Sequence, residues 1–212
     1  MKRRNQCPWE ARSRLGLWRG IYQTLKAVLF SPEDLFRNGK FEAGIREPLA
    51  YGLLLGSMGA MISLFWQFLM LAGGIAALDE PAVGRVAMSV VFLIVLVFVP
   101  LFVLVSMFMY GGILHLFLLL VRGGPRGFEA TFRVIAYSQA TQVWALIPFL
   151  GGWVAGIWQL VVQIIGLREI HETSYTRVIV AFLIPVAILL AVVVVGVILL
   201  FLYSGEPGFG RS

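Results

Sequence analysis

The chain offers few side chains that could catalyse a reaction. Its two imidazoles belong to His115 and His171. A serine hydrolase needs a base within reach of its nucleophile, and neither Ser106 nor Ser138 has the glycine-framed surroundings of such a nucleophile. His115 would have to meet one of them across two helices. We therefore predict no catalytic residue, and an intramembrane hydrolase stays only as a third hypothesis.

Metal ligands are equally sparse. Glu169 and Glu172 flank His171, but on a helix these two acids point in different directions, so the sequence favours a solvated loop over a metal site. The single cysteine, Cys7, excludes an intrachain disulfide and lies in no Cys/His cluster with metal-ligand spacing. We predict neither a metal nor a cofactor.

Uncharged polar side chains are more informative, because they fall inside long apolar segments. They are Gln67, Tyr137, Ser138, Thr141, Gln142, Gln159 and Gln163. Amide and hydroxyl groups hydrogen-bond between helices in a membrane. The sequence favours interhelical packing at these residues, and the alternative is a polar cavity lined by Gln142, Gln159 and Gln163 that accepts a solute or a lipid headgroup.

Glycines recur on one face of two of these segments. Small residues at spacings of three and four let helix backbones approach closely. The sequence therefore predicts helix-packing positions at Gly52, Gly56, Gly59, Gly152 and Gly156.

The elements that position these residues must lie in a membrane. Hydrophobic residues make up 59% of the chain and charged residues 13%, against roughly 25% charged in a soluble domain. A helix of ~20 apolar residues crosses the bilayer core. We predict an all-α fold, a polytopic transmembrane bundle of five helices over residues 50–203. Its spans are 51–74, 88–121 with a kink at Pro100, 129–147, 152–168 and 178–203, and the Pro-Phe-Leu-Gly-Gly sequence at 148–152 joins the third and fourth as a hairpin.

Charge gives the orientation of the bundle. Ten of the seventeen Lys and Arg residues precede Glu47, and five spans place nearly all the others on the same side. The positive-inside rule therefore predicts a cytoplasmic amino-terminal segment (1–49) and a carboxyl-terminal tail (204–212) on the opposite side of a cell membrane. Because the basic residues flank apolar spans, they favour membrane lipids over nucleic acid as partners. The spans lack the ionisable residues typical of ion-coupled transporters.

The amino-terminal segment contains an amphipathic stretch. Its apolar positions recur with helical spacing at Leu15, Trp18, Tyr22, Leu25 and Leu29. Such a helix either lies among lipid headgroups or packs on the protein's own cytoplasmic face. For the first alternative, the candidate lipid-interface residues are Arg14, Trp18, Arg19, Tyr22 and Lys26.

Three blocks of sequence carry a family resemblance: residues 30–36, residues 44–49 and, above all, the hairpin region 128–166, with Tyr137-Ser138, Gly151-Gly152 and Trp158. They resemble prokaryotic members of the Yip domain family. The resemblance implies a cytoplasmic amino terminus, five spans and a bacterial inner membrane. Eukaryotic members bind Rab-type GTPases in vesicle traffic, but this chain lacks their long acidic amino-terminal domain, so GTPase binding is not carried over.

These observations lead to two functional hypotheses. The first is a non-enzymatic membrane-organising or adaptor protein that acts through helix packing, oligomerisation or lipid contacts, with lipids, a second copy or other membrane proteins as partners. The alternative is a transporter or channel for a small neutral or lipid-like substrate.

Overall fold

The computed structural model describes residues 6–76 and 82–204, which form eight α-helices and one 3₁₀-helix. In chain order they are α1 (Arg12–Leu15), α2 (Leu17–Phe30), α3 (Pro32–Asn38), α4 (Arg46–Ala76), α5 (Ala82–Leu120), α6 (Gly127–Ser138), η1 (Gln139–Leu146), α7 (Gly151–His171) and α8 (Tyr175–Ser204). The predicted all-α fold is confirmed for these residues. Apart from Ser204, the predicted carboxyl-terminal tail lies outside them.

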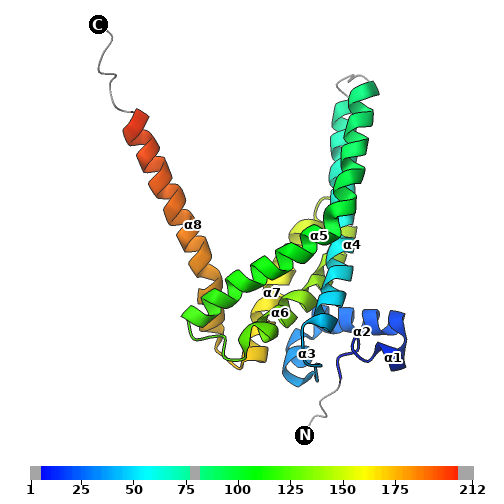
Figure 1. Ribbon diagram of the computed structural model, residues 1–212, viewed down its shortest axis with the longest axis vertical. Helices are drawn as coiled ribbons and strands as arrows, with labels where there is room; N and C mark the ends of the chain where they lie inside the picture. Colours follow the sequence, from blue (N-terminus) through cyan, green and yellow to red (C-terminus); the bar gives the residue numbers. More distant parts are fainter. Residues whose placement is uncertain (1–5, 77–81, 205–212) are drawn as a thin grey trace.

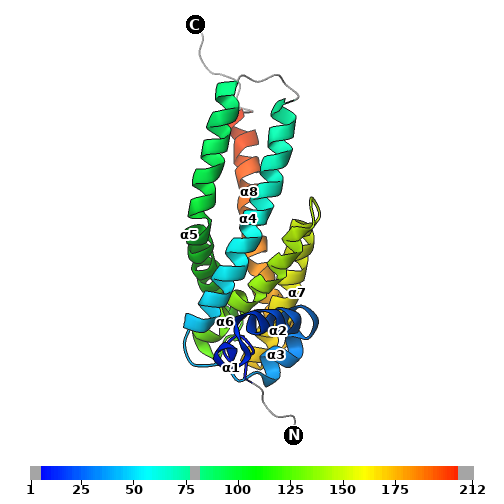
Figure 2. The same ribbon diagram turned by 90° about the vertical axis from the view of Figure 1, so that its right-hand side faces the viewer.

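The helices form a V with a cluster of short helices at its base (Figure 1). α4 and the first part of α5 run side by side along one arm, and α8 forms the other arm. α6, η1 and α7 make a hairpin between them, and α1–α3 cluster at the end where α4 begins (Figures 1 and 2). We call this end, which carries Arg12–Asn38, the basal end.

Four helices are long and apolar enough to cross a membrane: Arg46–Gly73, Val86–Leu120, Gly151–His171 and Tyr175–Phe201. They correspond to the first, second, fourth and fifth predicted spans. The predicted third span, 129–147, is divided between α6 and the 3₁₀-helix η1 and is not among them. Its first turns also carry Glu129 and Arg133, which form an ion pair. The predicted count of five spans is therefore not confirmed.

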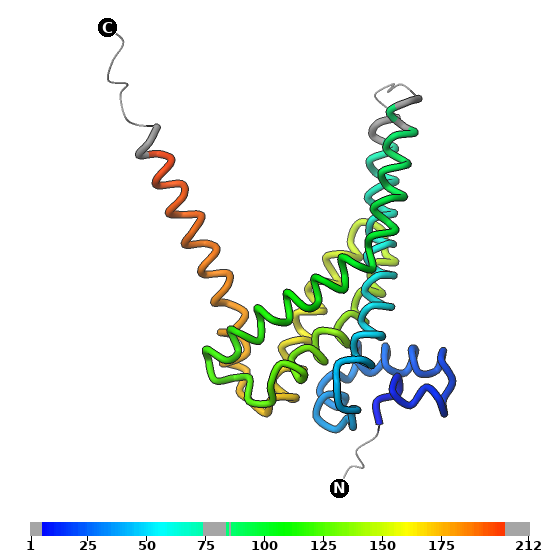
Figure 3. The backbone as a smooth tube through the Cα atoms, viewed as in Figure 1, coloured from blue at the N-terminus to red at the C-terminus, as the bar shows by residue number. Residues whose placement is uncertain are grey.

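The predicted kink in α5 and the predicted hairpin turn before α7 both have local causes. α5 is one continuous helix with Pro100 inside it, and it bends along its length (Figure 3), because proline removes a backbone hydrogen bond and clashes with the preceding turn. After η1, the chain reverses before Gly151, where α7 begins. A Cβ at Gly151 would lie 2.1 Å from the backbone oxygen of Trp144, so only glycine fits this turn.

Glycines bring α4 against the hairpin. A Cβ at Gly52 would lie 2.8 Å from the Ala136 backbone oxygen, and one at Gly59 would lie 2.4 Å from the Gln142 Cβ. A Cβ at Gly56 would lie 3.0 Å from a Val103 methyl carbon. α4 therefore contacts α6 and η1 at positions where no side chain fits, and it packs tightly against α5 at Gly56.

The two predicted packing glycines of α7 have different surroundings. An added Cβ at Gly152 or Gly156 meets no described atom within 4 Å. Their predicted role in helix packing stays a prediction.

We expect Gly59→Ala to destabilise the bundle by ~1–3 kcal/mol, because the added methyl group overlaps backbone and Cβ atoms of Gln142. Gly112→Ala in α5 is the control, since its Cβ would meet no described atom within 4 Å. Both variants are heated in detergent, and their thermal unfolding is followed through the fraction of protein that stays monodisperse at each temperature. Equal stability of the two variants would contradict the close approach of α4 to η1.

Candidate functional site

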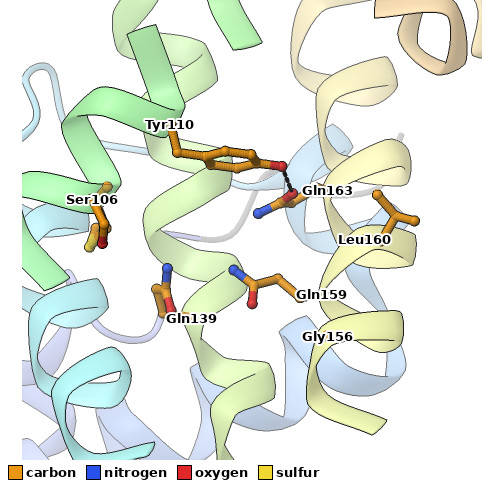
Figure 4. Close-up of a pocket in the computed structure, with 8 residues that line it drawn as sticks. Ser106, Tyr110, Gln139, Gly156, Gln159, Leu160 and Gln163 are labelled. Carbon is orange, nitrogen blue, oxygen red and sulfur yellow. Dashed lines mark hydrogen bonds between the residues drawn. The ribbon is translucent and has the colours of Figure 1, made fainter. Parts of the chain in front are cut away.

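A polar groove lies between α5, η1 and α7. Its volume is about 340 Å³, within the range of small-molecule pockets. The lining residues are Ser106, Met107, Tyr110, Gln139, Gly156, Gln159, Leu160 and Gln163, most of them visible in Figure 4. None of these lining residues is charged, and those of α5 and α7 belong to candidate membrane spans.

Gln163 is fully engaged at one end of the groove. The Tyr110 hydroxyl donates to its Oε1 (2.8 Å), and its Nε2 donates to the Ser138 hydroxyl oxygen (3.0 Å). The Ser138 hydroxyl in turn donates to the backbone oxygen of Ile135 (2.8 Å). This series of hydrogen bonds joins α5, α7 and α6. It provides partners for the side chain of Gln163, which is only 2% exposed.

A hydrogen bond between two glutamine side chains joins η1 to α7. Gln142 Nε2 donates to Gln159 Oε1 (2.9 Å), while the Thr141 hydroxyl donates to the Ser138 backbone oxygen (2.9 Å). Gln67 lies apart from the groove, with an exposed side chain that donates to the Ser63 backbone oxygen (3.3 Å). The structure therefore brings five of the seven predicted polar residues together, and it separates Gln67 and Tyr137 from them.

Three polar groove residues were not predicted as site residues from the sequence. Ser106 and Tyr110 are four residues apart on α5, which places them on one face of that helix, and Gln139 precedes Gln142 by three residues. Polar residues at helical spacing within an apolar segment were the available signal.

Tyr137 has a different role from the one predicted. Its hydroxyl donates to Glu10 Oε1 (2.8 Å), and the Glu42 backbone N–H donates to Glu10 Oε2 (2.6 Å). Glu10 is 7% exposed. Loss of hydration raises the pKa of this carboxyl, and the two hydrogen bonds oppose that rise.

Further bonds fix the amino-terminal segment to the bundle. Arg12 forms a bidentate ion pair with Glu47, near the start of α4. The Trp9 indole donates to the Glu47 backbone oxygen (3.0 Å), and the Trp9 backbone N–H donates to the Thr24 hydroxyl oxygen (2.8 Å). The segment is thus a folded part of the basal end.

α2 divides its apolar residues between the protein and the exterior. Leu29 is buried and Leu25 packs against the core, whereas the side chains of Trp18 and Tyr22 are 80% and 63% exposed. The two alternatives for this stretch therefore apply to different parts of one helix. The exposed part, with three cations beside it, is the surface patch: Arg14, Leu17, Trp18, Arg19, Tyr22 and Lys26.

The two histidines meet across Thr131, which the sequence did not suggest. His115 Nδ1 and His171 Nε2 each lie 2.9 Å from the Thr131 hydroxyl oxygen, and the Arg126 backbone N–H donates to His171 Nδ1. Because Nδ1 of His171 accepts this bond, His171 Nε2 is the donor to Thr131.

This arrangement corrects one expectation from the sequence. His171 is the last residue of α7 and is 1% exposed, so the predicted solvated loop is wrong. The end of α7 packs on α6, and this contact buries the His171 side chain. His115 bonds Thr131 rather than Ser106 or Ser138, and Thr131 is fully buried. The pair joins three helices and gives the hydrolase hypothesis no support.

Removing the Tyr137 hydroxyl should loosen the amino-terminal segment. Tyr137→Phe leaves the buried Glu10 carboxylate one donor short, a loss of ~1.5–3 kcal/mol for a hydrogen bond to a charged group. The single cysteine, Cys7, is 1% exposed, so its labelling rate by a maleimide reports undocking, and we expect a rise of about tenfold or more.

The control is Tyr51→Phe. Tyr51 is also buried, and its ring contacts that of Tyr137 in a tilted arrangement, with 5.3 Å between ring centroids. Its hydroxyl has no hydrogen-bond partner among the described residues. Its variant should label no faster than wild type. Equal rates for the two variants would show that the Glu10 bond does not hold the segment.

Docking should also depend on pH. Because burial raises the pKa of Glu10, docking is strongest where the carboxyl is protonated both docked and free. It weakens as the pH rises from the free pKa through the raised docked pKa and is constant above that. The ratio of Cys7 labelling rates in wild type and Glu10→Gln, measured with a disulfide reagent at each pH, should rise with pH and then level off. A flat ratio would contradict this assignment.

Comparison with known proteins gives one family match. A family model, the Yip1 domain, matches residues 26–196, which include the last turn of α2, all of α3 to α7 and much of α8. No curated protein and no solved structure matches the chain. The match covers most of the 212 residues, and the chain therefore belongs to the Yip1 domain family.

Proposed function

We propose that this protein is a non-enzymatic organiser of a bacterial inner membrane, which it shapes by holding an amphipathic helix in the cytoplasmic headgroup layer. The observation that carries the proposal is the surface patch of α2. Aromatic rings with exposures of 80% and 63% stand on a helix that also carries Arg19 and Lys26, and whose other face is built into the protein. Arg14, on α1, comes just before this helix.

The chemistry of the surface patch fits a lipid surface. Trp18 and Tyr22 are the ring types that favour the membrane–water interface, and each cation near an anionic leaflet contributes about 1 kcal/mol. α2 lies across the direction of α4 (Figure 1), as a helix in the headgroup plane must if α4 crosses the bilayer. α2 is anchored near its middle by the Trp9–Thr24 bond, and at its carboxyl end by the Trp158 indole, which donates to the Leu29 backbone oxygen (3.1 Å).

Rigid attachment is what turns lipid contact into membrane organisation. A helix inserted into one leaflet expands that leaflet, and its binding is sensitive to curvature. Because α2 is held against the spans, its insertion depth is fixed relative to them. The cytoplasmic orientation of the basal end is part of this proposal and rests on the excess of Lys and Arg before Glu47.

A transporter or channel for a small neutral or lipid-like substrate is the second candidate. The groove of about 340 Å³ with its uncharged polar lining favours it.

Insertion of α2 can be measured through Trp18. The chain has six tryptophans, so the difference between wild type and Trp18→Phe isolates the emission of this one. In vesicles that contain anionic lipids brominated near the headgroup, we expect Trp18 to lose most of its emission, because the ring then lies against the bromine atoms. Unquenched Trp18 emission would contradict insertion.

The organising activity has its own readout. Wild-type protein in vesicles should give smaller, more curved membranes by electron cryomicroscopy, and the double variant Trp18→Ser/Tyr22→Ser should leave them as large as protein-free vesicles. Gln23→Ala, an exposed change on the same helix, is the control and should act as wild type. Unchanged membranes with wild-type protein would overturn the proposal.

A further inference from the structure

The groove contains polar atoms that the protein leaves without partners. Among the described residues, the side-chain amide of Gln139 makes no hydrogen bond. The Gln159 amide uses its oxygen to accept from Gln142, and its nitrogen has no partner there either. An amide group away from water costs several kcal/mol unless it is hydrogen-bonded. A ligand that satisfies both amides would therefore be held at membrane depth.

The unused groups are donors. The Gln139 oxygen is turned toward α4, since a Cβ at Gly56 would lie 3.1 Å from it. Figure 4 shows the amide nitrogen of Gln159 turned toward Gln139, and that of Gln139 turned up the view, to the side where Ser106 and Tyr110 lie. The two hydroxyl groups of the lining already have acceptors. Tyr110 donates to Gln163, and Ser106 donates to the Val103 backbone oxygen. The groove thus presents two free –NH₂ groups to whatever enters it.

Donors without any charge select a particular ligand chemistry. With no cation in the lining, a phosphate or carboxylate would lose its hydration without a counter-charge. A neutral oxygen acceptor pairs with an amide N–H without that loss. Met107 and Leu160 supply apolar walls next to the amides, which suits a hydrocarbon chain attached to the acceptor.

We propose that the groove between α5, η1 and α7 binds a neutral lipid carbonyl, which accepts hydrogen bonds from Gln139 and Gln159. A bilayer offers this chemistry from two sources: the ester carbonyl of a glycerolipid and the ring carbonyl of a prenyl quinone. This inference is independent of the surface patch on α2, so either proposal can fail while the other stands.

Native mass spectrometry of the protein released from mixed lipid tests the proposal. The probes are a diester phosphatidylcholine, its diether analogue, which lacks the carbonyls, and a short-chain prenyl quinone. Wild type should retain the diester or the quinone about tenfold more than the diether, and the double variant Gln139→Leu/Gln159→Leu should lose that preference.

Gln67→Leu is the matched control, because Gln67 is an exposed amide on α4 that does not line this groove. Thermal unfolding of each variant verifies that it is folded. Retention of the diester without displacement by the quinone supports the proposal with a glycerolipid source, and retention of the quinone supports it with the quinone as source. Equal retention of diester and diether with no retained quinone, or the same preference in the double variant as in wild type, would overturn it.

Discussion

The close approach of α4 to the α6–η1 segment is the constraint on which the rest of the structure depends. Helices in a bilayer gain no hydrophobic driving force from each other, so they associate through close packing and hydrogen bonds. Gly52 and Gly59 remove the side chains that would otherwise meet Ala136 and Gln142. With α4 on one side and α7 on the other, η1 lies between them. The Gln139 side chain therefore lies against α4 and the Gln142 side chain against α7, and the polar groove follows from that placement.

The same segment also connects the membrane-embedded interior to the basal end. Tyr137 lies one residue before Ser138 and points the other way: Ser138 accepts from Gln163 in the interior, while Tyr137 donates to Glu10. The position of α6 therefore determines where the amino-terminal segment docks, and that segment fixes α2 across the direction of the spans. Burial of the Glu10 carboxylate is the energetic cost of this connection.

The parts of the fold that were predictable from the sequence depend on local signals. A membrane imposes a minimum apolar length, so four spans follow from hydropathy, and Pro148 with Gly151 marks the hairpin turn. The glycine faces of α4 and α7 have the same spacing, yet only that of α4 is covered. Spacing shows which residues share a face and carries no information about what packs on it.

The features that were missed are set by contacts between distant residues. The segment 139–146 contains good helix formers, and its 3₁₀ winding coincides with its position between α4 and α7 rather than with any breaker before Pro148. Glu10 meets a hydroxyl 127 positions away, and His171 meets Thr131 from 40 positions away. No periodicity in the sequence reports such pairs. The groove was predicted only in part for the same reason, since Tyr110 belongs to a different helix from Gln163.

Charged and uncharged polar groups are separated in this protein, and the separation has a physical basis. The ion pairs Arg12–Glu47, Arg37–Glu169 and Arg133–Glu129 lie at the basal end, where α4 begins and α7 ends. The groove within the spans uses amides and hydroxyls alone. In a medium of low polarity an unpaired charge is far more expensive than an unpaired amide, while an amide hydrogen bond is stronger there than in water. An uncharged groove can therefore remain without a partner at moderate cost and still gain substantially when an acceptor enters. That difference is what a reversible site inside a membrane requires.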